Sequence, residues 1–89
     1  MSMNSAVSSG PLTTDTLLAT GKNYLKGALI LAASNLILYD NTSAAGKIIF
    51  QYDNSTGTLP VHVDFAHMVQ AHIGLFADVV AGTVFVYYG

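Results

Sequence analysis

The sequence predicts an all-β fold, an antiparallel β-sandwich of about 7–8 short strands that is jelly-roll-like and follows an extended N-terminal arm. The first reason is alternation. In residues 61–65 (VHVDF) the apolar side chains share one face and the polar ones the other, which is the period of a half-buried strand. The second reason is that clusters such as DNTSAAG and DNSTG separate the apolar segments. Gly, Asn, Asp and Ser are the residues that form tight turns.

Eight segments have the composition and spacing of strands. They are residues 16–20, 23–32, 35–40, 47–53, 58–65, 68–72, 75–80 and 83–88. The segment AHMVQAHIG (66–74) is the exception to this pattern, because it contains good helix formers. One helical turn that crosses an end of the sandwich is therefore an alternative there.

The length and composition predict one domain with a thin core and a surface that binds other copies of the chain or a partner. Residues 1–14 are rich in Ser, Thr, Asn and Gly and read as a flexible arm, whereas residues 15–89 form the sandwich domain. The chain is 52% hydrophobic and only 9% charged, while soluble domains carry about 25% charged residues. Because so few charges leave little to keep a monomer in solution, we expect the domain to bury apolar surface against copies of itself or a partner.

The charge pattern excludes several classes of partner. The net charge is −2, arginine is absent, and the lysines are Lys22, Lys26 and Lys47, so there is no basic footprint for nucleic acid. The apolar run at residues 27–33 is far shorter than the roughly 20 residues that span a membrane. We therefore expect neither nucleic acid nor membrane as a partner.

No arrangement of side chains indicates catalysis. Serines and threonines are plentiful, but none lies in a GxSxG elbow, and cysteine is absent. Asp40 and Asp53 each end a predicted strand and open a turn, which is an ordinary structural role for aspartate. We expect that the chain is not an enzyme, with no catalytic residue and no cofactor.

Three histidines, His62, His67 and His72, recur every five residues. This spacing matches neither one strand face nor one helix face. A metal site of His62, Asp64 and His72 is an alternative that would need a particular turn to bring the three together. Ordinary surface or interface histidines are the favoured interpretation, and we expect no metal.

Two predicted strands, in residues 36–39 and 83–88, are apolar on both faces. In a sandwich the outer faces are normally polar, so these strands predict a surface for self-association. The residues expected in this interface are Leu36, Ile37, Leu38, Tyr39, Phe85, Tyr87 and Tyr88.

Two longer segments carry a resemblance to a known family. LILYDNTSAAGKIIFQ (36–51) and GLFADVVAGTVFVYYG (74–89) resemble small, all-β virion proteins of tailed bacteriophages. In that family a strand ending in Leu-Tyr-Asp is followed by a short Ser/Ala/Gly turn and another strand. The chain then closes with a Gly-Leu-aromatic strand, a Gly turn and a valine/tyrosine strand. The resemblance covers residues 24–89, departs at 66–74 and leaves out the arm.

The resemblance implies a capsid decoration or cement protein, which is made in the host cytoplasm and lies on the capsid exterior of the virion. It implies a homo-oligomer, with a trimer favoured, that binds across major capsid subunits or another virion protein. The arm is the part expected to contact the capsid, through Ser5, Val7, Pro11 and Leu12.

A tail, neck or fibre module that binds a carbohydrate or receptor is the alternative function. The tyrosines motivate it, because an aromatic face with polar groups beside it can bind a sugar. In this interpretation Tyr39, Tyr52 and Tyr87 form one exposed platform.

Overall fold

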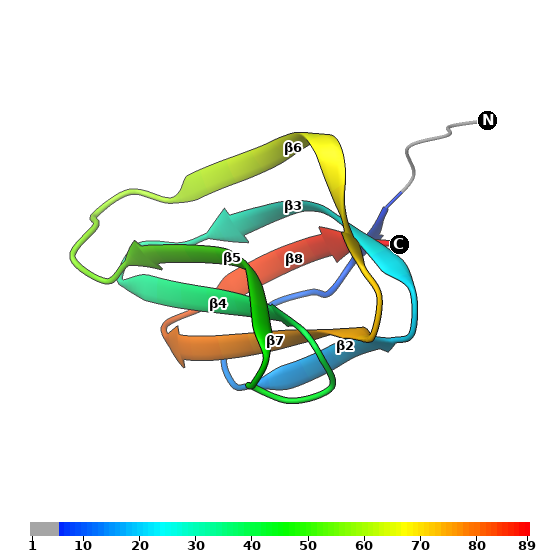
Figure 1. Ribbon diagram of the computed structural model, residues 1–89. Coiled ribbons are helices and arrows are strands. Elements are labelled where there is room, and N and C mark those ends of the chain that lie inside the picture. The colour runs from blue at the N-terminus through cyan, green and yellow to red at the C-terminus, as the bar shows by residue number, and fades with distance from the viewer. Residues whose placement is uncertain (1–5) are drawn as a thin grey trace.

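The computed structural model describes residues 6–89 and shows two antiparallel four-stranded sheets packed against each other (Figure 1). Strand order is β1-β8-β3-β6 in one sheet and β2-β7-β4-β5 in the other. The strands are β1 (Val7–Ser8), β2 (Thr16–Thr20), β3 (Asn23–Ile30), β4 (Ser34–Asp40), β5 (Lys47–Asn54), β6 (Val61–Ala71), β7 (Gly74–Ala81) and β8 (Val84–Tyr88). The prediction of an all-β sandwich is confirmed.

Most predicted strands are present with bounds shifted by one or two residues, and β2 has the predicted bounds. The prediction is wrong for residues 58–72, where one strand, β6, replaces two strands and the alternative helical turn. Strand β6 pairs with β3 on both sides of an irregularity, with Asp64 opposite Gly27 and Val69 opposite Leu25. Helix nucleation is costly for so short a segment, so pairing along β3 outweighs its helix-forming composition.

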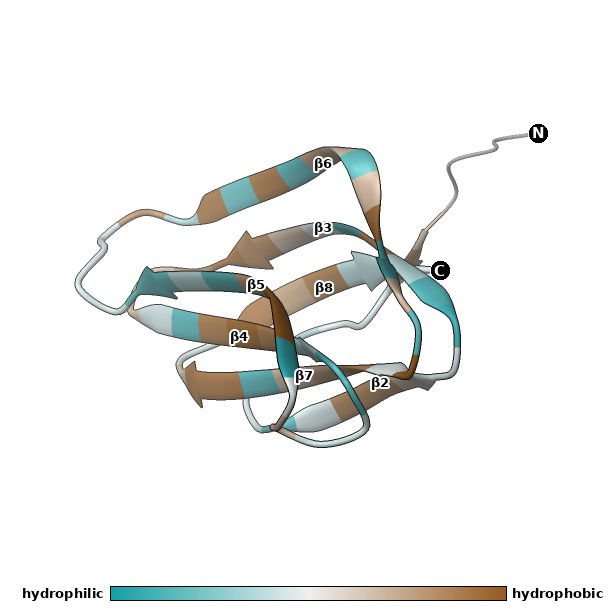
Figure 2. Cartoon of the chain, in the orientation of Figure 1, coloured by the Kyte–Doolittle hydropathy of each residue, from teal (hydrophilic) through white to brown (hydrophobic). Residues whose placement is uncertain are grey.

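The core lies between the two sheets and is built from alternate residues of the central strands. Figure 2 shows the same alternation along the edge strand β6, as brown and teal bands. The largest fully buried apolar side chains are Leu25, Ile30, Leu36, Leu38, Leu75, Val84 and Val86. Edge strands β5 and β6 add a contact between the sheets, because the rings of Phe50 and Phe65 meet edge to face at 5.3 Å.

The described part of the predicted arm belongs to the sandwich. Strand β1 pairs with β8, and the hydroxyl of Ser9 accepts a hydrogen bond from the Val86 N–H at 2.9 Å. Leu12 and Val84 exchange two backbone hydrogen bonds of 2.8 and 3.0 Å, and the Leu12 side chain is buried in the core. Sequence reasoning placed the start of the domain at residue 15, but the fold already includes residues 7–12.

Replacing Leu12 with alanine is therefore expected to lower the free energy of unfolding by about 2 kcal/mol, the lower end for a buried leucine because Leu12 lies at the rim of the core. Urea unfolding followed by circular dichroism measures this loss. The matched control is Val7→Ala, since Val7 is exposed on β1 and should change stability little. Equal effects of the two substitutions would contradict the packing of Leu12.

Asp40 ties the two sheets together at one end of β4. Its buried carboxylate accepts hydrogen bonds from the backbone N–H of His72 (3.0 Å to each oxygen) and Ile73 (2.8 Å) in the β6–β7 turn, and of Gly74 (3.4 Å) at the start of β7. Burial by itself would raise the pKa of the Asp40 carboxyl. The N–H donors of Ile73, His72 and Gly74 outweigh burial and hold that pKa below its usual value.

Two buried polar side chains hold the other end of the sandwich. The Ser34 hydroxyl accepts from the Thr83 N–H at 2.9 Å and donates to the Thr83 carbonyl at 3.0 Å. The Asn54 amide donates to the carbonyls of Leu31 and Leu59 at 3.1 and 3.0 Å. These contacts satisfy loop carbonyls that would otherwise be left without partners, so the loops at this end are fixed.

Candidate functional site

A row of apolar side chains crosses the outer face of the β2-β7-β4-β5 sheet. Strand register places Leu17 opposite Phe76, Phe76 opposite Tyr39, and Tyr39 opposite Ile48. Directly opposite residues on antiparallel strands point to the same face. The residues next to Phe76 and Tyr39 along their strands are buried, so the row points away from the core. We call Leu17, Phe76, Tyr39 and Ile48 the apolar row.

The two ends of the apolar row are open to solvent. Leu17 is 42% exposed and Ile48 is 46% exposed, whereas the two middle residues are half-buried by their neighbours. Ile37 lies on the same face in a neighbouring register position, and exposed Val80 lies further along β7. Exposed apolar side chains that form a continuous patch mark interaction surfaces. The apolar row is therefore the candidate surface for a protein partner.

A pair of carboxyl groups borders this surface. Asp78 lies opposite Ile37 in the register, and Asp15 accepts a hydrogen bond from the Val79 N–H at 3.0 Å. Burial raises the pKa of the Asp78 carboxyl, and the hydrogen bond with Asp15 and the charge of Asp15 raise it further. A partner that covered the apolar row would remove more water from this pair.

The predicted self-association residues of β4 split between the core and this surface. Leu36 and Leu38 are fully buried, so they cannot contact another folded copy, and their assignment to the interface is corrected. Ile37 and Tyr39 alternate with them and lie on the outer face. Both faces of residues 36–39 are apolar, so the sequence alone does not show which two of the four side chains point inward and which two point outward.

The predicted residues of β8 lie on the opposite side of the molecule. Phe85 and Tyr87 are half-buried, alternate with buried residues, and belong to the outer face of the β1-β8-β3-β6 sheet. Tyr88 packs against the core at the end of β8. The predicted residues therefore do not form one surface, because the two outer faces of a sandwich point in opposite directions.

The residues that sequence reasoning missed are Leu17, Phe76 and Ile48. Each stands in a predicted strand, and Phe76 shows the alternation of an outward residue. The signal that joins them with Tyr39 is the register between four strands. Register depends on pairings between distant segments, which a single sequence does not display.

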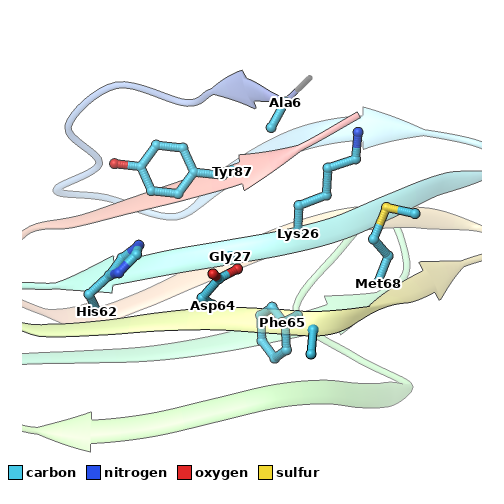
Figure 3. Close-up of a pocket in the computed structure, with 9 residues that line it drawn as sticks. Ala6, Lys26, Gly27, His62, Asp64, Phe65, Met68 and Tyr87 are labelled. Carbon is cyan, nitrogen blue, oxygen red and sulfur yellow. The ribbon is translucent and has the colours of Figure 1, made fainter. Parts of the chain in front are cut away.

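The outer face of the other sheet contains an open groove of about 590 Å³ (Figure 3). Gly27 of β3 lies at its centre, with Tyr87 of β8 opposite on one side and Asp64 of β6 opposite on the other. A Cβ atom at Gly27 would lie 3.0 Å from the Val63 carbonyl oxygen, so a side chain there would crowd β6. The residues that line the groove are Ala6, Lys26, Gly27, His62, Asp64, Phe65, Ala66, Met68 and Tyr87.

Three polar side chains stand around Gly27. Figure 3 shows His62 and Asp64 rising from β6 and Lys26 from β3, on the same side of the sheet as Tyr87. The rings of His62 and Tyr87 are edge to face with centroids 6.5 Å apart. The groove thus combines an aromatic ring, a carboxylate, an imidazole and an ammonium group.

The three histidines lie in different surroundings. His62 lines the groove, His67 is exposed in the middle of β6, and His72 lies in the turn that Asp40 holds. Within residues 6–89, no three His or Asp side chains come close enough to hold a metal ion. The alternative of a metal site at His62, Asp64 and His72 is therefore not supported by the geometry.

The tyrosines do not form one platform, so this element of the alternative function is corrected. Tyr39 and Tyr87 lie on the outer faces of different sheets. Tyr52, on edge strand β5, pairs with buried Leu36 and so shares its inward-facing side. Of the three, only Tyr87 lines the groove.

The residues predicted to contact a capsid through the arm are also dispersed. Ser5 lies outside the described residues. Val7 and Pro11 are exposed, whereas Leu12 is buried in the core of its own domain. Leu12 is therefore removed from the set of possible contact residues.

Comparisons of the chain with protein-family models, with curated proteins and with solved structures gave no significant match. The part of the chain that the structure describes contains no helix with the length and hydropathy of a transmembrane span.

Proposed function

We propose that the chain is a structural protein of a tailed-bacteriophage particle, a capsid decoration or cement protein that self-associates and binds across major capsid subunits. The observation that carries the proposal is the apolar row, which crosses every strand of one outer face. The low charge content of 9% supports it, because such a surface needs a partner to be stable in water. The resemblance of residues 24–89 to phage virion proteins supplies the setting.

The strand orders β1-β8-β3-β6 and β2-β7-β4-β5 support classifying the sandwich as a jelly roll. Except for β4 and β5, strands that follow each other in the sequence lie in different sheets. Jelly rolls of eight strands occur in viral capsid and lectin domains. Fold analogy alone does not assign a function, so it adds to the apolar row and does not replace it.

A cement protein acts by the area that it buries and not by chemistry. An interface of about 1,600 Å² can hold a partner with micromolar to picomolar affinity. In a trimer, the three copies present three contacts at once, and binding of the first raises the effective concentration of the others. The strand edges of the sandwich and the exposed arm residues Val7 and Pro11 would contact the shell.

Quantitative mass spectrometry and antibody labelling of particles produced from the natural genome test this function. We expect the chain in a copy number comparable with that of the major capsid protein, and gold-labelled antibody on the capsid exterior. Label confined to the tail, neck or fibres would instead support the alternative module. Particles without the chain would contradict both assignments.

A further inference from the structure

The groove on the β8-β3-β6 face has the size of a ligand site. Its volume of about 590 Å³ lies within the range of roughly 300–1,000 Å³ that is typical of small-molecule sites. Tyr87 and Asp64 stand on opposite sides of Gly27, two strand spacings apart. Neighbouring strands are about 4.8 Å apart, so the two backbones are about 10 Å apart. Gly27 has no side chain and is buried, and the Tyr87 ring packs toward it, with its Cδ2 atom 3.7 Å from where a Cβ atom of residue 27 would lie.

The two opposite charges in the groove disfavour a ligand with a net charge of one sign. The carboxylate of Asp64 repels an anionic ligand, and the ammonium group of Lys26 repels a cationic one. Both side chains line the same groove. An entirely apolar ligand would remove water from these groups without replacing their hydrogen bonds. An uncharged ligand rich in hydroxyl groups meets neither repulsion and can replace the hydrogen bonds that water makes with these groups.

We propose that this groove binds a neutral saccharide, with a sugar ring stacked on Tyr87 and its hydroxyl groups bonded to Asp64 and His62. A sugar ring has a flat face of C–H groups, which fits an aromatic ring that is apolar in its body and polar at its tip. Asp64 accepts hydrogen bonds from hydroxyl groups, and a bond to an ionised acceptor is stronger than a neutral one. His62 adds one donor and one acceptor when its ring is neutral.

The site does not depend on self-association. The groove and the apolar row lie on the outer faces of different sheets, so a saccharide and a second copy of the chain can bind together. A capsid protein with such a groove would attach particles to a glycan-coated surface. The sugar site and the proposed structural role can therefore fail separately.

Fluorescently labelled full-length protein on an array of neutral and acidic glycans tests the site, with titration calorimetry on each oligosaccharide that is retained. We expect binding to a subset of neutral glycans. Asp64→Asn and Tyr87→Ala should each weaken that binding about tenfold or more. The matched controls are His67→Ala, on the same strand but outside the groove, and Tyr52→Ala, on the other sheet. Both should bind as the unchanged protein does.

A blank array would overturn the proposal. Binding to acidic glycans alone would overturn the neutral class, and binding that survives both groove substitutions would overturn the location. Asp64 is exposed, so Asp64→Asn keeps the fold and decides the question even if Tyr87→Ala unfolds the protein.

Discussion

Replacing Asp40 with alanine is expected to lower the free energy of unfolding by about 2–4 kcal/mol, because the substitution leaves three backbone N–H groups without an acceptor. Those donors belong to His72 and Ile73 in the β6–β7 turn and to Gly74 at the start of β7. The turn joins strands of different sheets, so the loss affects how the sheets are held together. Urea unfolding at pH 7, followed by circular dichroism, measures the effect.

Asp53 provides a matched control, since it also ends a predicted strand and opens a turn. Its carboxylate accepts a hydrogen bond from the Ser55 N–H at 2.9 Å, but it is fully exposed to water. Water can replace an exposed acceptor, so Asp53→Ala should cost far less than Asp40→Ala. Similar losses for both variants would contradict the role of Asp40.

The effect of Asp40 should also depend on pH. The pKa of the Asp40 carboxyl is lowered in the folded protein. The stability that its carboxylate contributes to the fold is therefore fully present above the unfolded pKa of about 3.9. The contribution is lost as the pH falls through the lower folded value. We expect the stability difference between the unchanged protein and Asp40→Asn to be constant near neutral pH and to shrink below about pH 4. A difference that grows toward acid would have the wrong sign.

The second large effect is expected at the apolar row. The double substitution Leu17→Asp with Ile48→Asp should weaken self-association about a hundredfold or more, because each buried carboxylate would lie in an interface without a partner. Both side chains are partly exposed in the single chain, so the fold itself should tolerate the change. Sedimentation velocity over a range of concentrations measures the shift from oligomer to monomer.

Leu59→Asp is the control for this experiment. Leu59 is 73% exposed and lies outside the strands, away from the apolar row. It introduces one negative charge on an exposed apolar residue, half of the change in the double variant, so a loss of association through net charge alone would show in part in this variant as well. If Leu59→Asp weakened self-association as much as the double variant does, the placement of the interface at the apolar row would be contradicted.

The sequence predicted the strands well because alternation and turn residues are local signals. Assigning the faces was harder. In β4 both faces are apolar, and only pairing with β7 and β5 shows that Leu36 points inward and Tyr39 outward. Leu12 had no periodic neighbours within the arm, so its place in the core depends on a bridge to Val84 at the far end of the chain.

The groove could not be foreseen for the same physical reason. Its aromatic ring, its floor and its carboxylate come from three strands that are distant in sequence. Sequence reasoning considered Tyr87 and Asp64 separately, as members of a tyrosine platform and of a metal site. The register through Gly27 brings the two together.

The solution mass of the full chain, measured by light scattering behind a sizing column, tests self-association through the apolar row most directly. We expect a stable oligomer, favoured as a trimer with three times the 9.4 kDa of one chain, and a single-chain mass for the Leu17→Asp, Ile48→Asp variant. A single-chain mass for the unchanged protein at every concentration tested would contradict self-association.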